Sequence, residues 1–308
     1  MNYLFLITSF LSSFISLKLS IPLLTRYLLD EVNERSSHTK SKPRGGGIII
    51  LLITLIGSIL LKDYKILFGI PLFITSLIDD LKGISMKNRF IIQLSTVISL
   101  LIYAQNSNSW ISGLSFELSV LLYIPLTIFL VGIINFINFM DGVDGMIASN
   151  FIIIFAFISL FSDSHLIIII GSLIAFIFFN WHPSKVFLGD IGSIFIGYTL
   201  ISEIIFCNDS RIAICFVLVS SPLLLDPLFC LIARLRSKKN IFKAHKTHLY
   251  QRLHQAGLGH PLVSTIYFTT TSILCISYLI GKLNYLFAAL IFFTIIGFYI
   301  NKKMAVSI

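Results

Sequence analysis

The sequence predicts an all-α, polytopic membrane protein, a transmembrane bundle of about 10–11 helices. Of its 308 residues, 56% are hydrophobic and 12% are charged, with a mean hydropathy of +0.93. A soluble domain carries about 25% charged residues. Apolar runs of spanning length recur along the chain, and no stretch between them is long enough for a soluble domain. We therefore expect residues 1–308 to form one integral-membrane domain.

The expected spans follow the apolar runs in order. A spanning helix needs roughly 17–25 mainly apolar residues. Such runs lie near residues 3–24, 46–62, 64–79, 90–104, 118–134, 145–161, 165–180, 191–207, 212–232, 263–281 and 284–301. The pair that meets around Lys62, Asp63 and Lys65 is the least distinct, so the count is ten or eleven.

The basic residues orient the bundle. Lys18 and Arg26 follow the first apolar run, which places the N-terminus outside, and the run lacks the features of a cleaved signal peptide. With eleven spans, the outer loops contain only Lys62, Lys65, Arg211 and Lys282, and the other basic residues of the loops lie inside. This asymmetry accounts for most of the net charge of +9, so nucleic acid is not an expected partner. The four cysteines form no CxxC pattern or ligand cluster and are interpreted as small apolar residues.

The same topology brings acidic residues to the inner membrane face. Asp79 and Asp80 end the third span, Asp141 and Asp144 lie between the fifth and sixth, and Asp190 lies between the seventh and eighth. Ionisable residues at a membrane are costly and mark functional sites. We expect a cytoplasmic-face site built from these three segments.

Two of these segments suit a hard divalent cation. The adjacent carboxylates of LIDDLKGIS (77–85) repel each other unless a cation neutralises them, and Mg²⁺ prefers such oxygen ligands. In FNWHPSKVFLGDIGS (179–193), Gly189 and Gly192 let the backbone around Asp190 turn tightly. Taken singly, the first is equally well explained as a solvated helix end and the second as an ordinary interhelical turn.

The segment NFINFMDGVDGM (135–146) places Asn135, Asn138, Asp141 and Asp144 three residues apart. On a helix, neighbours in this series share a face. Carboxamides and carboxylates can hydrogen-bond a base or a sugar. A polar cap on the sixth span is the simpler alternative, which the regular spacing disfavours.

Two basic segments could bind phosphate. SSHTKSKPRGGG (36–47) joins His38, Lys40, Lys42 and Arg44 to three glycines at the start of a helix, where cations and backbone N–H groups favour anions. AHKTHLYQRL (244–253) contains His245 and His248, which could contact a pyrophosphate or a metal. Zinc is the weaker option there, because no carboxylate or cysteine is near in sequence.

Together these motifs resemble the polyprenyl-phosphate N-acetylhexosamine-1-phosphate transferases, the integral-membrane glycosyltransferase family 4. The resemblance rests on SSHTKSKPRGGG, LIDDLKGIS, NFINFMDGVDGM, NWHPSKVFLGDIGS and AHKTHLYQRL, which occur in the family's order over nearly the whole chain. It implies a multi-pass transferase of the inner, cytoplasmic membrane. A UDP-amino sugar would give its sugar-1-phosphate to a polyprenyl phosphate, undecaprenyl phosphate in a bacterium, and UMP would leave. The HLYQR version is more similar to the O-antigen-initiating branch than to the pentapeptide-transferring one.

The resemblance also implies roles for residues. Asp79, Asp80 and Asp190 would be catalytic, with Mg²⁺ on Asp190 and Asp80 and Mn²⁺ as the alternative ion. Asp79 would position or deprotonate the lipid phosphate, and direct attack is favoured over a covalent aspartyl intermediate. The expected substrate-binding residues are Arg44, Asn135, Asn138, Asp141, Asp144, Phe187, His245, His248 and Arg252.

Some features depart from this pattern or favour other functions. The family's DDxxD motif ends here in Gly83, which leaves Asp79 and Asp80 without the third acid. Glu203 and Asp226 lie within apolar runs, which would also suit a secondary transporter. A non-catalytic lipid-binding scaffold is a third option that no feature requires. The sequence identifies neither the sugar nor the oligomeric state, a homodimer being one option.

Overall fold

The fold is almost entirely helical, as the sequence predicts. A computed structural model of the chain describes residues 2–30, 41–162, 165–240 and 245–306. In these ranges the elements are α1 (Asn2–Tyr27), β1 (Leu29–Asp30), β2 (Lys42–Pro43), α2 (Gly46–Leu60), the 3-10 helix η1 (Lys65–Gly69), α3 (Ile70–Lys82), α4 (Met86–Gln105), α5 (Phe116–Phe139), α6 (Met146–Ile158), α7 (Leu166–Asn180), α8 (Asp190–Phe206), α9 (Ser210–Val219), α10 (Ser221–Arg236), α11 (Leu249–Gln255) and α12 (His260–Lys303).

Several of these helices have the composition of membrane-spanning segments. Among the described residues, α1, α5 and α12 are long and apolar enough to cross a membrane, and α9 with α10 forms a fourth candidate bent by 69°. The helices α2, α6 and α7 are equally apolar but shorter. Leu121, Ile124 and Ile291 are 62–73% exposed, which suits contact with lipid rather than water. The protein is therefore a multi-pass membrane protein.

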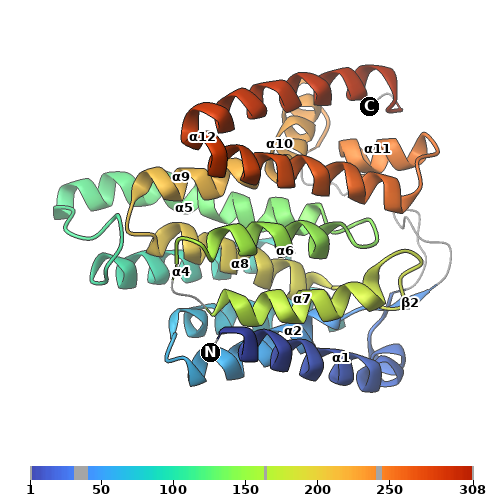
Figure 1. Cartoon of the computed structure of the whole chain (residues 1–308), viewed down its shortest axis with the longest axis horizontal. Helices are drawn as coiled ribbons and strands as arrows, with labels where there is room; N and C mark the ends of the chain where they lie inside the picture. Colours follow the sequence, from blue (N-terminus) through green and yellow to red (C-terminus); the bar gives the residue numbers. More distant parts are fainter. Residues whose placement is uncertain (1, 31–40, 163–164, 241–244, 307–308) are drawn as a thin grey trace.

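Most of the expected spans map onto these helices. The run 212–232 is divided between α9 and α10 by their bend, and the run 64–79 is divided between η1 and α3. The runs 263–281 and 284–301 are the two arms of α12, whose helical geometry is broken between them at Gly281 and Lys282. Figure 1 shows α12 turning back on itself at this break, so its two arms lie side by side. The short helix α11 lies in the inner loop, where apolar runs predicted none.

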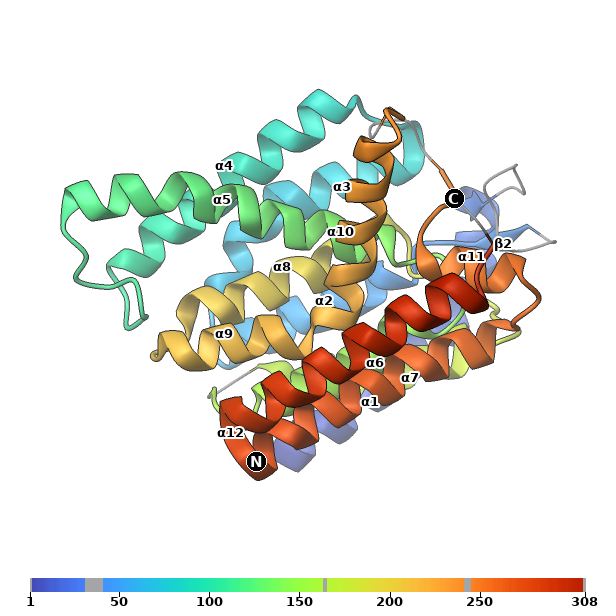
Figure 2. The same cartoon turned by 90° about the horizontal axis from the view of Figure 1, so that it is seen from above.

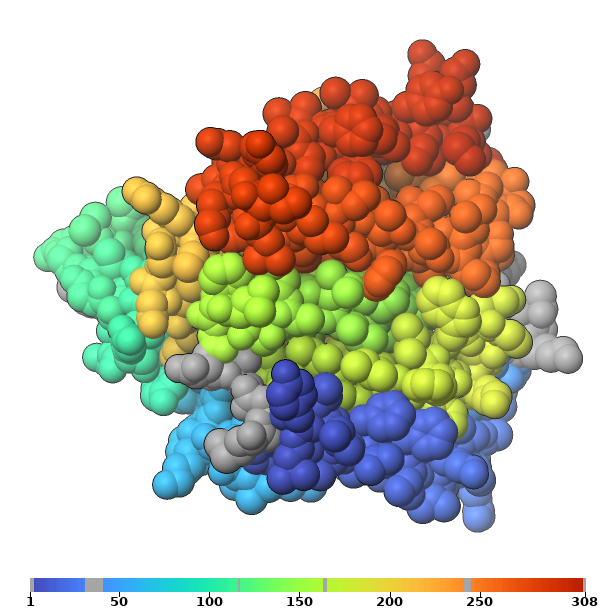
Figure 3. All heavy atoms as spheres, viewed as in Figure 1, coloured from blue at the N-terminus to red at the C-terminus, as the bar shows by residue number. Residues whose placement is uncertain are grey.

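The helices form layers. In Figure 1 one layer runs from α1 through α7 and α6 to α12, and each helix of the series packs on the next. Figure 3 shows the same helices covering one face of the molecule. Seen from above in Figure 2, α8 lies behind this layer and α5, α3 and α4 lie further back. α8 contacts α2, α3 and α5, and fifteen of its seventeen residues are buried, so it is the centre of the bundle.

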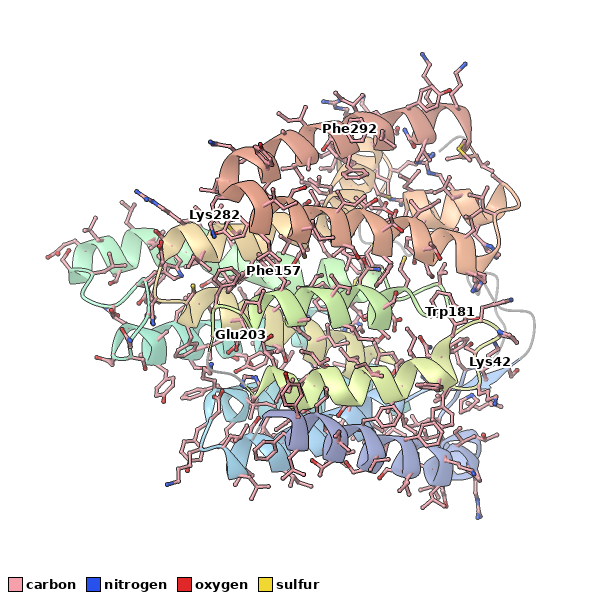
Figure 4. The ribbon with its side chains drawn as sticks, viewed as in Figure 1. Lys42, Phe157, Trp181, Glu203, Lys282 and Phe292 are labelled. Atoms are coloured by element: carbon pink, nitrogen blue, oxygen red, sulfur yellow. The ribbon has the colours of Figure 1, made fainter. Side chains whose placement is uncertain are left out.

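The loops separate into two groups at opposite ends, as the alternating topology requires. Figure 4 shows Lys42 and Trp181, from loops expected inside, at one end, and Glu203 and Lys282 toward the other. At the end of Glu203, the Nζ atom of Lys65 lies 3.4 Å from this carboxylate. His165 hydrogen-bonds Asp63 there as well. Glu203 is thus paired at the end of the bundle that was expected to lie outside.

We expect a substitution at Gly47 to destabilise the bundle. A Cβ atom added to Gly47 would lie 2.2 Å from the Cα of Gly192 on α8, where only backbone faces backbone. Overpacking of this kind costs about 1–3 kcal/mol or more. Gly47→Ala should therefore lower the melting temperature in detergent, measured by intrinsic fluorescence or loss of the monodisperse peak.

The matched control is Gly132→Ala, because Gly132 is also helical and its added Cβ would meet nothing within 4 Å. This control should melt like the unmodified protein. Equal melting temperatures for the two variants would contradict the close α2–α8 packing.

Candidate active site

The N-terminal wall of the site is the short β1–β2 pair. Leu29 pairs with Pro43 and Asp30 with Lys42 in antiparallel register, and the backbone N–H of Arg44 donates to the Leu28 carbonyl at 2.8 Å. These bonds fix the chain just before α2. The side chains of Lys42 and Arg44 then reach two different carboxylates. His38 and Lys40 lie outside the described residues.

The three glycines that follow serve packing. The N–H groups of Gly46 and Gly47 donate to the carbonyls of Phe187 and Leu188, both at 2.9 Å. Gly45 has a φ of +96°, a conformation that favours glycine. The amides of Gly46 and Gly47 that were expected to face a phosphate are thus bonded to the loop before α8. This joins two of the predicted segments directly.

Asp80 connects that loop to α3. Its Oδ1 accepts the N–H of Asp190 at 3.4 Å, and its Oδ2 accepts that of Ile191 at 3.2 Å. Arg44 donates to the Asp80 carbonyl, and its Nη1 atom lies 3.5 Å from Oδ1. Asp80 is therefore buried at the start of α8, where a carboxylate also stabilises the helix N-terminus.

Asp79 is held by a partner that sequence reasoning did not select. Its Oδ2 accepts a hydrogen bond of 2.6 Å from Nη1 of Arg89, and its Oδ1 accepts the N–H of Ile84 at 2.7 Å. The same Arg89 atom lies 4.0 Å from Oδ2 of Asp190. Arg89 was counted only toward membrane topology, yet it sits between two of the predicted catalytic carboxylates.

Asp141 and Asp190 have the least compensated charge. Burial raises the pKa of Asp141 to about 8, with further contributions from the charges of Asp190, Asp80 and Asp144. Burial and the charges of Asp80 and Asp79 raise the pKa of Asp190 to about 7. Within the described residues, no hydrogen bond or ion pair reaches the Asp141 carboxylate.

Asp79, Asp80, Asp141 and Asp190 are hereafter called the acidic cluster. Its four carboxylates face two guanidinium groups, those of Arg44 and Arg89. When all four carboxylates are ionised, they carry two more charges than these two guanidinium groups, and a bound divalent cation would stabilise that ionised state. The donor set of carboxylate oxygens also fits such an ion.

Asp144 belongs to a neighbouring polar group instead. Its carboxylate accepts hydrogen bonds of 2.8 Å from His182 and from the hydroxyl of Ser184, and it lies 3.5 Å from Nδ1 of His260 and 3.7 Å from Nζ of Lys42. Although burial opposes it, the hydrogen bonds from His260, Ser184 and His182 lower the pKa of Asp144. Asp144 thus connects the loop before α6 to the loop before α8, to β2 and to the start of α12.

The two asparagines of NFINFMDGVDGM differ in their surroundings. Asn138 accepts a 2.6 Å hydrogen bond from Ser193 in the first turn of α8, next to Asp190. Asn135 exchanges two hydrogen bonds with Gln93 of α4, at 2.8 and 3.2 Å. The Phe187 ring lies 5.2 Å from Nζ of Lys42. Asn138 and Phe187 therefore border the site, while Asn135 links α5 to α4 behind it.

The segment with His245 and His248 packs against the other side of the Asp141 loop. The hydroxyl of Tyr250 donates to the Phe139 carbonyl at 2.9 Å and occupies the space beside Gly142. Asp226 accepts the N–H groups of Leu249 and Tyr250 at 2.7 and 3.1 Å, so it caps α11. This capping role accounts for Asp226, which together with Glu203 had suggested a transporter.

Arg252, for which a phosphate contact was expected, is bonded within the protein. Its guanidinium donates to the carbonyls of Thr247 and Val306, at 3.1 and 2.8 Å, and to the side chain of Asn301. Arg252 therefore anchors the last turns of α12 to the histidine segment. Burial lowers the pKa of both His245 and His248 to about 4, so both imidazoles are neutral at physiological pH.

Sequence reasoning missed the residues that hold the predicted ones. They are Arg89, His182, Ser184, His260, Gln93 and Ser193. Lys42 was considered for phosphate binding, and in the structure it lies beside Asp144. His182, Ser184 and Ser193 are part of the quoted motif NWHPSKVFLGDIGS, which was the available signal. Gln93 and His260 lie in other helices, and only folding brings them to their partners.

Comparisons with known proteins place these motifs in a family. The model of the family described as Glycosyl transferase family 4 matches residues 64–208, which include the whole acidic cluster. A probable undecaprenyl-phosphate N-acetylglucosaminyl 1-phosphate transferase of Bacillus subtilis is 28% identical over 306 residues, 90% of this chain and 85% of the relative.

Two further relatives agree. A phospho-N-acetylmuramoyl-pentapeptide-transferase of Wolbachia pipientis is 33% identical over 231 residues, covering 63% of this chain and 71% of the relative. An undecaprenyl-phosphate alpha-N-acetylglucosaminyl 1-phosphate transferase of Thermotoga maritima is 28% identical over 256 residues, 79% of each chain. The chain therefore belongs to glycosyl transferase family 4, the polyprenyl-phosphate N-acetylhexosamine-1-phosphate transferases.

Proposed function

We propose that this protein transfers an N-acetylhexosamine-1-phosphate from a UDP-sugar to a polyprenyl phosphate, undecaprenyl phosphate in a bacterial membrane, and releases UMP. Members of its family are phosphotransferases that use a polyprenyl phosphate acceptor. The observation that carries the proposal is the acidic cluster. Three distant segments bring four carboxylates together with only two guanidinium groups, so the site attracts a cation and the anionic groups that share it.

The residues proposed to bind a divalent cation are Asp190 and Asp80, with Asp141 beside them. Asp190 is partly exposed. Asp80 is buried, and its two carboxylate oxygens accept the backbone N–H groups of Asp190 and Ile191. When bound, Mg²⁺, or Mn²⁺ in its place, supplies positive charge that stabilises the departing UMP phosphate. Asp80 and Arg44 keep the turn at Asp190 in place, so the carboxylates are positioned before substrate arrives.

Asp79 is the residue proposed to position the lipid phosphate. Arg89 and the N–H of Ile84 donate hydrogen bonds to its carboxylate and fix its orientation. The acceptor phosphate oxygen attacks the β-phosphorus of the UDP-sugar, the bond to the bridging oxygen breaks, and UMP leaves with that electron pair. A phosphate is already a competent nucleophile, so direct attack needs no aspartyl intermediate.

The substrate-binding roles remain proposals. Asn138, Phe187 and Asp144 are proposed to contact the uridine and sugar, Asp144 from the polar group beside the acidic cluster. His245 and His248 are proposed to contact phosphates on the other side of the Asp141 loop. Arg44, Asn135 and Arg252 are bonded within the protein, so we assign them the positioning of the segments that make these contacts.

The location and product follow from the same proposal. The site lies at the end where the basic inner loops gather, which supports a cytoplasmic active site in the inner membrane. Residues 1–308 would act as one transferase domain, with a homodimer as a further option. The product, a polyprenyl-pyrophosphate amino sugar, would initiate a surface glycan such as O-antigen. A MurNAc-pentapeptide donor is disfavoured by the HLYQR segment.

We expect UMP release from purified protein to require both a polyprenyl phosphate and a divalent cation. The assay would contain detergent-solubilised protein, undecaprenyl phosphate, Mg²⁺ and one of a panel of UDP-amino sugars. EDTA should reduce the rate by at least about 100-fold, because the cation stabilises the leaving phosphate by several kcal/mol. Excess Mg²⁺ should restore it.

Two controls decide the interpretation. Omitting the lipid should abolish release, whereas UMP formed without lipid would indicate hydrolysis by a contaminant. Release that is insensitive to EDTA would contradict the role of the acidic cluster. The secondary-transporter alternative has lost its main support, since Glu203 and Asp226 are both bonded within the protein.

A further inference from the structure

A second cluster of metal-ligating side chains lies outside the acidic cluster. Cys230 of α10 meets His245 and His248 of the segment before α11, and one ligand atom of each lies within 4.8 Å of the others. The hydroxyl of Thr247 bridges two of them, 3.2 Å from the Cys230 sulfur and 2.9 Å from Nδ1 of His245. Zinc was the weaker option in the sequence because no cysteine is near these histidines along the chain. In the structure the chain folds back after α10, which brings Cys230 beside them.

The chemistry of this cluster differs from that of the acidic cluster. Thiolate and imidazole ligands select borderline-soft ions such as Zn²⁺, whereas carboxylates suit Mg²⁺. Cys230 and His248 are 4% and 5% exposed. The Nδ1 atom of His248 is buried and has no hydrogen-bond partner among the described residues. A buried nitrogen without a hydrogen bond is costly, so the ring of His248 has an unused ligand atom.

Nearby charges act in both directions. Arg234 helps to lower the pKa of both histidines and Arg252 that of His248, and both guanidinium groups would also repel a metal ion. Asp226 opposes them, because its Oδ1 lies 3.9 Å from Nδ1 of His248. A thiolate formed at Cys230 on binding would add a second negative charge. The carboxylate beside a histidine ligand is also a common arrangement around bound metals.

We propose that Cys230, His245 and His248 bind Zn²⁺ or a similar thiophilic divalent cation, with water as the fourth ligand. Zinc–ligand bonds of about 2.0–2.3 Å place ligand atoms roughly 3.5 Å apart, so the side chains need to close by about 1 Å. The Cys230 thiol loses its proton to solvent, and no redox step is involved. Resting on the proposed function, we infer that the metal inhibits transfer, because it withdraws His245 and His248 from substrate phosphates.

Cobalt spectroscopy tests the site without relying on activity. Co²⁺ would be added to the full chain in detergent with excess Mg²⁺ to occupy the acidic cluster. Binding should produce a thiolate-to-cobalt charge-transfer band in the near ultraviolet, and Zn²⁺ should displace it. Cys230→Ser should remove the band. The matched control is Cys207→Ser. Cys207 is also a free cysteine, but it follows the last residue of α8 and is not one of the three proposed ligands.

A second variant and an activity readout complete the test. His245→Gln, at a half-buried position, should also lose the band while remaining monodisperse.

In zinc-free buffer Cys230→Ser should turn over normally, and its half-inhibitory Zn²⁺ concentration should rise at least about tenfold. No band in the unmodified protein, or a band that persists in Cys230→Ser, would overturn the proposal. A Cys230-dependent band in protein that releases no UMP would support the metal site and count against the proposed function alone.

Discussion

Asp190→Asn should leave a folded protein whose rate of UMP release falls by about 100- to 1,000-fold or more. Asparagine keeps the shape and the backbone N–H that bonds Asp80, so the turn before α8 should stay intact. It replaces the partly exposed carboxylate that is proposed to bind the cation with a neutral amide. The loss should therefore appear as a lower kcat together with a higher Mg²⁺ requirement, measured by titrating Mg²⁺ in the release assay.

Comparison with two other variants makes this result specific. Glu117→Gln removes an exposed carboxylate in the first turn of α5, away from the cluster, and should behave as the unmodified protein. Asp80→Asn should lose activity and also melt earlier, because Asp80 is buried and bonded to the turn and to Arg44. Normal turnover in Asp190→Asn would rule out the acidic cluster as the catalytic site.

Arg89→Ala should lower kcat by about 100-fold or more, although no motif had marked this residue. Arg89 holds Asp79 at 2.6 Å and lies 4.0 Å from Asp190, so its loss frees one carboxylate and increases repulsion in the cluster. Misplacing a reacting group by about 1 Å can cost 100-fold. Initial rates over a range of lipid and UDP-sugar concentrations would separate kcat from KM.

The controls for Arg89 use its own helix. Lys87→Ala removes an exposed cation two residues earlier in α4 and should keep full activity. Arg89→Lys retains the charge but not the geometry of the guanidinium, so it should recover only part of the rate. A purely structural role would instead give Arg89→Ala a lower melting temperature with an unchanged kcat for the folded fraction.

Much of the fold could be predicted because membrane helices leave a strong local signal. Hydropathy located the helical segments, and the distribution of lysine and arginine grouped the loops that the structure gathers at each end. A break inside one apolar run was harder to predict. The bend between α9 and α10 lies in continuous apolar sequence, where hydropathy barely changes. The turn in α12 was predicted, because Lys282 separates the two apolar runs there.

The candidate site shows the same division between local and long-range information. The motifs by themselves identified the carboxylates of the acidic cluster, because charged groups in an apolar chain are conspicuous. Their partners could not be identified in this way, since Arg89 appeared to serve topology and the three glycines appeared to serve phosphate binding. The structure instead shows Arg89 bonded to Asp79, and Gly47 packed on Gly192.

The sequence alone thus determined the class of protein, the order of its helices and the side chains suited to bind a cation and phosphates. Only the tertiary structure decided which of these side chains have partners. It turned Arg252 toward Val306, brought Cys230 beside two histidines, and left Asp141 without a bond among the described residues. The physical reason is that composition and spacing act within one segment, whereas ion pairing and ligation depend on distances of a few ångströms between segments that meet only when the helices pack.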